Sequence, residues 1–135
     1  MGFGKNVILD ATKLGKDDAT LKAAKWILPE NDWYDVVVHG TPDNFMINTG
    51  QKWVSITHRD LVTYLKNQGY KMGTPIRLIS CNTGVFPDAI GQHLANKIGS
   101  QVKAPKGLIT VYESGNYTIS GPTGDWRYFK PQKLD

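Results

Sequence analysis

The sequence predicts an α/β fold in which a mostly parallel central sheet is flanked by helices. Short apolar runs alternate with amphipathic segments up to about residue 100, and parallel strands need crossover connections of that kind. The valine-rich run at residues 34–38 is typical of a strand buried on both faces. A length of 135 residues with a hydrophobic fraction of 40% is enough for one core, so we expect a single domain over residues 1–135.

Periodicity and stop signals place the elements in order along the chain. Pro29 ends the first helical pattern, and Thr57 with Asp60 forms the signature of a capping box at the start of the second. We expect strands at residues 6–10, 34–38 and 75–80, and helices at residues 17–28, 57–68 and 87–98. A β-hairpin, residues 45–47 with 52–56, should follow the strand that ends at His39. The last third should be β-rich, with strand-like stretches at residues 101–104, 108–112, 117–119 and 126–129.

The composition narrows the classes of function. No apolar run is long enough to span a bilayer, and the single cysteine cannot form a disulfide within the chain. A net charge of +4 and a pI near 9.2 are compatible with a polyanionic partner such as nucleic acid or an acidic protein. However, the lysines are spread along the whole chain, which favours a solvated, mildly basic surface over a dedicated anion site.

Two residues with complementary chemistry follow the predicted core strands. His39 comes directly after the run at residues 34–38, and Cys81 comes directly after the run at residues 75–80. The carboxyl ends of parallel strands meet at one edge of a sheet, where sites in open α/β sheets are found, so the two residues should lie close together. A thiolate attacks a carbonyl carbon, and an imidazole can accept the thiol proton. We therefore predict Cys81 as a nucleophile and His39 as its acid–base partner.

Further features of the predicted site are less specific. The backbone N–H groups of Gly40 and Cys81 are candidate donors to a developing oxyanion, and the turn at residues 81–84 should precede a helix whose positive end favours the thiolate. A third catalytic residue stays unassigned between Asp35 and Asp43. We expect His58 and His93 to be surface or boundary residues. No metal-ligand spacing is present, so neither a metal nor a cofactor is predicted.

Two other functions stay open on the residues alone. A metal-independent ribonuclease could pair His39 with a lysine, although the aromatic residues stand at strand positions typical of core packing, which makes nucleic acid a disfavoured partner. A binding domain without catalysis would keep Cys81 as a small buried residue.

The two strand ends resemble the caspase-type cysteine peptidases of clan CD, whose signature is an apolar block ending in His-Gly and a later apolar block ending in a small residue and Cys. Here the blocks are residues 36–40 and 78–81, and His39 and Cys81 lie 42 residues apart. Within the clan, residues 34–129 are most similar to the self-processing cysteine protease domains, and related effector domains, of bacterial toxins.

The resemblance implies a peptidase with His39 and Cys81 as catalytic residues and the amides of Gly40 and Cys81 as oxyanion donors. It also implies a strand that pairs with the substrate backbone, which would be formed by Val102, Lys103, Ala104 and Pro105. The substrate would be a peptide or protein, and an acidic immunity or inhibitor protein would be a partner. The domain would be secreted, or delivered to a target cell as part of a larger toxin, and act in the cytoplasm. The toxin processing domains are activated by inositol hexakisphosphate at a basic surface, and the scattered lysines here do not carry that feature over.

Overall fold

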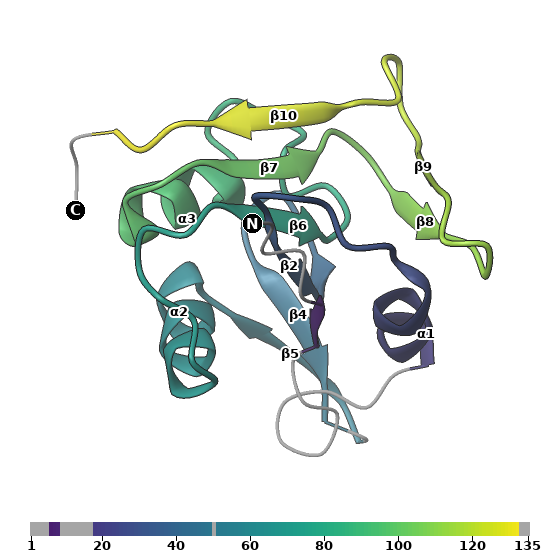
Figure 1. The fold of residues 1–135 in the computed structure, drawn as a ribbon, viewed down its shortest axis with the longest axis horizontal. Coiled ribbons are helices and arrows are strands. Elements are labelled where there is room, and N and C mark those ends of the chain that lie inside the picture. Colours follow the sequence, from purple (N-terminus) through teal and green to yellow (C-terminus); the bar gives the residue numbers. More distant parts are fainter. Residues whose placement is uncertain (1–5, 9–17, 50, 133–135) are drawn as a thin grey trace.

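The structure is a computed structural model that describes residues 6–8, 18–49 and 51–132. Its main sheet is mixed, with the strand order β1-β2-β6-β7-β10. The first four strands run parallel to one another, and β10 is antiparallel to β7 (Figure 1). The strands are β1 (Asn6–Ile8), β2 (Tyr34–Val37), β6 (Ile76–Ile79), β7 (Val102–Pro105) and β10 (Trp126–Phe129). The predicted α/β class with a largely parallel sheet is confirmed.

Three helices cover the two faces of this sheet: α1 (Asp18–Trp26), α2 (His58–Asn67) and α3 (Ile90–Ile98). Helices α2 and α3 bury their apolar side chains against one face, and α1 packs on the other (Figure 1). Because strand side chains alternate between faces, Val36 and Leu78 point into the first core, whereas Val37 and Ile79 point into the second. None of the described helices is long and apolar enough to cross a membrane.

The helix signals in the sequence are partly confirmed. Thr57 accepts a hydrogen bond from the backbone of Asp60, whose side chain accepts one from the backbone N–H of Thr57, so the capping box is present. Gly99 ends α3 in the left-handed conformation, with φ 69°. The prediction that this helix begins at residue 87 is wrong, because turns tied by Val85 N–H to Asn82 O and by Ala89 N–H to Phe86 O continue up to residue 89.

Two small sheets complete the fold. The predicted hairpin is confirmed as β4 (Phe45–Asn48) and β5 (Trp53–Ile56), which join β3 (His39–Gly40) in a three-stranded sheet. The second small sheet is a ribbon of β8 (Ile109–Val111) and β9 (Tyr117–Ile119). His39 was predicted to end the core strand itself, whereas the chain leaves the main sheet after Val38 and pairs His39 with Met46 of β4. In the predicted first strand and first helix, residues 9, 10 and 17 lie outside the described residues.

Candidate functional site

The register of the main sheet brings the two predicted strand ends side by side. Val37 of β2 is paired with Ile79 of β6, and the N–H of Val38 donates to the carbonyl of Ile79 over 3.3 Å. His39 follows Val37 by two residues, and Cys81 follows Ile79 by the same two. Both residues therefore leave the carboxyl edge of the sheet at the same level.

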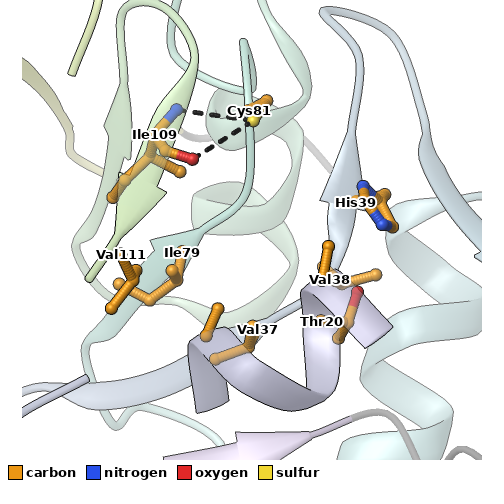
Figure 2. Close-up of a pocket in the computed structure, with 10 residues that line it drawn as sticks. Thr20, Val37, Val38, His39, Ile79, Cys81, Ile109 and Val111 are labelled. Atoms are coloured by element: carbon orange, nitrogen blue, oxygen red, sulfur yellow. Dashed lines mark hydrogen bonds between the residues drawn. The ribbon is translucent and has the colours of Figure 1, made fainter. Parts of the chain in front are cut away.

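A small pocket under α1 contains both side chains. Its volume is about 70 Å³, and it is lined by Ala19, Thr20, Ala23, Val37, Val38, His39, Ile79, Cys81, Ile109 and Val111. Figure 2 shows Cys81 beside Ile109 on one side of this pocket and His39 on the other side. The rest of the lining is mainly aliphatic, so the pocket that the thiol and the imidazole share is weakly polar.

Gly40 lies tightly against the segment that carries the thiol. A Cβ atom added at Gly40 would clash with Ser80 Oγ and would lie 2.5 Å from Thr83 Cγ2 and 2.7 Å from the carbonyl oxygen of Cys81. These distances are shorter than any ordinary contact, so the close approach of the two strand ends requires glycine at this position.

The turn that carries Cys81 is fixed on several sides. The hydroxyl of Thr83 donates to the carbonyl of Ser80 over 2.8 Å, and the N–H of Asn82 donates to the carbonyl of Gly107 over 2.8 Å. Asn82 has φ 63°, in the left-handed region that non-glycine residues other than Asn and Asp rarely adopt. Asparagine tolerates this conformation, so the residue after Cys81 suits the sharp turn of the chain.

The thiol of Cys81 is half-buried and free. Within the described residues, the hydrogen bonds of its Sγ atom both involve Ile109: the N–H of Ile109 donates to Sγ over 3.4 Å, and the thiol donates to the carbonyl of Ile109 over 3.7 Å. Sulfur forms weak hydrogen bonds, so strand β8 holds the thiol loosely at the wall of the pocket.

The imidazole of His39 packs edge-on against an aromatic ring. The ring centroids of His39 and Trp53 lie 4.9 Å apart with an interplanar angle of 86°. Trp53 is about half exposed and belongs to the hairpin that the sequence predicted beside His39. The contact restrains the orientation of the imidazole.

The two aspartates considered as a third catalytic residue have other surroundings. Both carboxylate oxygens of Asp35 accept hydrogen bonds from Arg77, at 2.5 and 2.7 Å, in the interior of the protein. Asp43 is exposed, and its N–H donates to the hydroxyl of Thr41 in the turn between β3 and β4. Asp35 is thus committed to an ion pair away from His39.

The predicted contribution of a helix end to the thiol site is wrong. Helix α3 begins well beyond the turn at residues 81–84, and its first N–H groups bind elsewhere: Ile90 N–H donates to the carbonyl of Pro42 and Gly91 N–H to that of Thr83. The helix start instead joins the turn after β3 to the turn after β6.

The stretch predicted to pair with a substrate forms β7, in the interior of the main sheet. Its side chains, those of Val102, Lys103, Ala104 and Pro105, are buried. One edge of β7 pairs with β6, and the other pairs along its full length with β10. A substrate backbone could pair with β7 only if β10 were displaced.

Several residues of the site were missed in the sequence. They are the wall residues on α1 and β8, such as Ala23, Ile109 and Val111, and the aromatic partner Trp53. The wall residues are small or aliphatic, and nothing in their local pattern distinguishes them from ordinary core residues. Trp53 carried a weak signal, because it stands in the hairpin expected next to His39.

The remaining histidines and possible metal ligands lie apart from this pocket. His58 and His93 stack on each other between α2 and α3, with ring centroids 5.5 Å apart. His93 is exposed and His58 is half-buried, as expected for surface or boundary residues. Among the described residues, no group of three or more His, Cys, Asp or Glu side chains could hold a metal ion.

These observations define a class: a mixed α/β domain in which a thiol and an imidazole line one pocket at the carboxyl edge of a largely parallel sheet. The chain belongs to the family described as domain of unknown function DUF8616, whose family model matches residues 9–119. No curated protein matches the sequence.

Proposed function

We propose that the protein is a cysteine peptidase in which Cys81 is the nucleophile and His39 is the acid–base partner. The observation that carries this proposal is the shared pocket: His39 and Cys81 arrive from adjacent parallel strands and line one cavity, with Gly40 packed against the carbonyl of Cys81. Because a Cβ atom at Gly40 would clash with the segment that carries Cys81, the close approach of these two segments depends on glycine at this position.

The proposed reaction has two steps. The thiolate of Cys81 attacks the carbonyl carbon of a peptide, the C–N bond breaks, and His39 gives its proton to the departing amine, leaving a thioester on Cys81. A water molecule then attacks the thioester while His39 accepts a proton from it, so the carboxylic acid is released and the thiolate of Cys81 with protonated His39 is restored. The position of His39 across the pocket suits transfer to the leaving group, because a scissile bond lying between the two side chains would present its nitrogen to the imidazole.

The backbone at Gly40 suits the role of an oxyanion donor. The N–H of Thr41 donates to the carbonyl of Asn44, so Thr41 is a hydrogen-bonded position of the β3–β4 pair. Hydrogen-bonded and non-hydrogen-bonded positions alternate in antiparallel pairs, so the N–H of Gly40 points away from β4. Removal of one such donor commonly lowers the rate by about 10²–10³-fold in peptidases.

The wider setting follows from the resemblance to clan CD and its toxin domains. We propose that the domain is an effector or self-processing module of a larger secreted toxin and acts on a peptide or protein in a target cell. The basic net charge suits an acidic immunity or inhibitor protein as a partner. The proposed chemistry is complete with protein groups and requires neither a metal nor a cofactor.

The direct test is cleavage of a defined mixture of peptides, with new amino termini identified by mass spectrometry. Wild-type protein should produce cuts at a restricted set of bonds, and Cys81→Ala and His39→Ala should each remove them. The exposed histidine His93 provides a matched control, since His93→Ala should retain cleavage. Cuts that survive in Cys81→Ala would contradict the proposal.

The hydrogen bonds of the thiol favour one alternative, a binding domain in which Cys81 is structural. Both Sγ contacts tie the loop after β6 to β8, as a purely structural thiol would. This alternative predicts a thiol that reacts slowly with iodoacetamide at every pH and no effect of His39→Ala. The ribonuclease alternative predicts RNA cleavage that Cys81→Ala leaves intact and His39→Ala removes.

A further inference from the structure

A groove continues from the His39/Cys81 pocket along the space between α1 and β8. A second cavity of about 310 Å³ is lined by Lys22, Trp26 and Thr110 together with Ala19, Ala23, Ile109 and Val111. The last four also line the pocket that contains the thiol. The two cavities therefore form one groove with α1 as one wall and β8 as the other, and Cys81 stands at its end.

Strand β8 turns an open edge away from its partner β9. The N–H of Ser120 donates to the carbonyl of Leu108, and the N–H of Tyr112 donates to the carbonyl of Asn116. Positions 108 and 112 are thus hydrogen-bonded positions of the ribbon, and so is position 110 between them. It follows that the N–H and C=O groups of Ile109 and Val111 point to the other edge of β8.

The contacts of Ile109 confirm the direction of that edge. Its N–H and C=O groups both bind Cys81 Sγ, so the edge faces the thiol (Figure 2). The next outward position is Val111, for whose N–H and C=O the structure gives no partner among the described residues. An open edge with unpaired groups is the surface to which an extended peptide adds as a further strand.

We infer that β8, and not β7, is the strand that recognises the substrate. The ligand is an extended peptide that lies in the groove, pairs with the outward groups of Val111, and replaces the Cys81 sulfur at Ile109, so that its own carbonyl carbon comes beside Sγ. This assignment rests on the proposed peptidase function for the reaction, but the binding of the peptide does not depend on it.

The pocket beside the thiol restricts the side chain that precedes the reacting carbonyl. Its volume of about 70 Å³ is roughly half that of an engineered cavity of about 150 Å³ that holds benzene. Apart from His39, Cys81 and Thr20, the side chains that line it are aliphatic, and Val37 and Ile79 form its floor. A small aliphatic side chain fits this space, whereas an aromatic ring does not.

The test measures alkylation of Cys81 by acetyl-Val-Val-Ala chloromethyl ketone, compared with chloroacetone, which carries the same electrophile without a peptide. Intact-protein mass gives the rates, with Cys81→Ala as the blank. The peptide reagent should react at least roughly tenfold faster than chloroacetone, and a reagent with phenylalanine in place of alanine should lose most of this advantage. Equal rates for the peptide reagent and chloroacetone would overturn the inference.

A backbone substitution on β8 isolates the strand pairing. Val111→Pro removes the outward N–H without removing a β8–β9 hydrogen bond, and Val111→Ala is its matched control because it loses the same side-chain packing but keeps the N–H. With each rate divided by the same variant's rate with iodoacetamide, Val111→Pro should slow the peptide reagent by roughly fivefold relative to Val111→Ala. Equal rates in the two variants would contradict pairing at β8.

A modified reagent makes the same test on the wild-type protein, so the result does not depend on whether a variant folds. Methylation of the peptide nitrogens of the reagent removes the donors that would bind β8 carbonyls, and it should slow alkylation by a similar roughly fivefold factor. An unchanged rate would again exclude strand pairing.

The peptide-mixture assay separates this inference from the proposed function. Fast labelling by the peptide reagent without any peptide cleavage would support peptide binding along β8 and contradict the peptidase function. Cleavage that Val111→Pro does not affect would support the peptidase function and contradict peptide binding along β8.

Discussion

On one face of the sheet, the amino ends and the carboxyl ends of β2 and β6 differ in charge and in burial. Toward their amino ends, Asp35 and Arg77 are paired in register and buried, and Lys103 of β7 continues the row. At their carboxyl ends, His39 and Cys81 line an aliphatic pocket. The first region is charged and closed, whereas the second is nearly uncharged and open.

The charged region has partners on every side. Arg77 also donates to the carbonyl of Leu28 over 2.8 Å, and Lys103 forms an ion pair with Glu30. The ammonium of Lys103 lies 5.0, 5.2 and 5.6 Å from the ring centroids of three aromatic residues, which are Trp33, Trp126 and Tyr128. These contacts offset the removal of the charges from water.

The difference between the regions indicates how the site is positioned. Burial raises the pKa of Asp35 in spite of the opposing effect of Arg77, so desolvation of this carboxylate costs more than its partner returns. A buried ion pair of this kind is weak evidence for stability but can specify register. The offset of 42 residues between Asp35 and Arg77 is the same as that between His39 and Cys81. We therefore interpret the ion pair as an interaction that sets the relative alignment of the two strands that end near His39 and Cys81.

The largest effect should come from breaking this pair on one side. Arg77→Met leaves Asp35 as an unpaired buried charge and should lower the free energy of unfolding by about 3–5 kcal/mol, as measured by urea denaturation. Arg59→Met on the exposed face of α2 is the control and should change it by less than about 0.5 kcal/mol. A small loss in Arg77→Met would show that Asp35 is not held as a buried carboxylate.

The same variant should have a characteristic pH dependence. The pKa of Asp35 is already raised in the folded state, and loss of Arg77 should raise it further, so the folded protein binds the Asp35 proton more tightly than the unfolded chain does. Stability of Arg77→Met should therefore increase as the pH falls from 7 toward 5, relative to wild type. An unchanged difference between the two proteins over this range would contradict the sign of the shift.

Replacing both Asp35 and Arg77 distinguishes an effect of the ion pair on strand register from an effect on stability. Asp35→Leu combined with Arg77→Met removes both charges and should be roughly as stable as wild type, within about 1–2 kcal/mol. If the pair sets the register, this stable double variant should nevertheless lose part of the alkylation rate of Cys81 at pH 6.5. If the double variant kept the wild-type rate of Cys81 alkylation, the ion pair would not be needed to set the register.

A smaller effect is expected at the open end. Gly40→Ala places a methyl group against Ser80, Thr83 and the Cys81 carbonyl and should lower the free energy of unfolding by about 1–3 kcal/mol. Ser80→Ala alone should be nearly neutral, because Ser80 Oγ is buried and has no hydrogen-bond partner among the described residues. Ser80 Oγ is one of the atoms that the added methyl group would meet, so the double variant Gly40→Ala/Ser80→Ala should recover part of the lost free energy of unfolding in urea denaturation. No recovery would argue against this close packing.

The smallest effect should come from Trp53, the aromatic neighbour of His39. Trp53→Ala removes the edge-on contact with His39 and should reduce the part of the Cys81 alkylation rate that depends on His39 by roughly threefold. Trp53→Phe keeps an aromatic partner and should retain most of that rate. Because Trp53 is half exposed, thermal unfolding should change little in either variant, and equal alkylation in both would assign the ring no orienting role.

The sequence predicted the open end better than the closed end. Apolar runs ending in His39 and Cys81 and the rule on carboxyl edges were sufficient to expect the two residues at one edge. The closed end was not predicted, because a lysine at position 103 and an aspartate at position 35 carry no local sign of burial. The burial of Lys103 depends on Glu30 and Trp126, and that of Asp35 depends on Arg77, partners that are distant in the sequence.

The walls of the pocket and the surroundings of β7 were missed for the same reason. Whether a strand such as residues 102–105 lies at an edge depends on the strand that covers it, and here β10 pairs with it from the end of the chain. Ile109 is a wall residue because the ribbon folds back over the thiol, a tertiary contact without a local pattern. Periodicity predicts elements, whereas the neighbours of each element follow from packing.

Coupling between Cys81 and His39 is measured most directly by the rate of iodoacetamide alkylation of Cys81 across pH 5–9. Wild type should react at pH 6.5 at a rate close to its rate at pH 8.5, and His39→Ala should lose most of the reaction at pH 6.5 while retaining it at pH 8.5. A slow reaction in both proteins at pH 6.5, with the same dependence on pH, would contradict a thiolate stabilised by His39 and would leave Cys81 as a structural thiol.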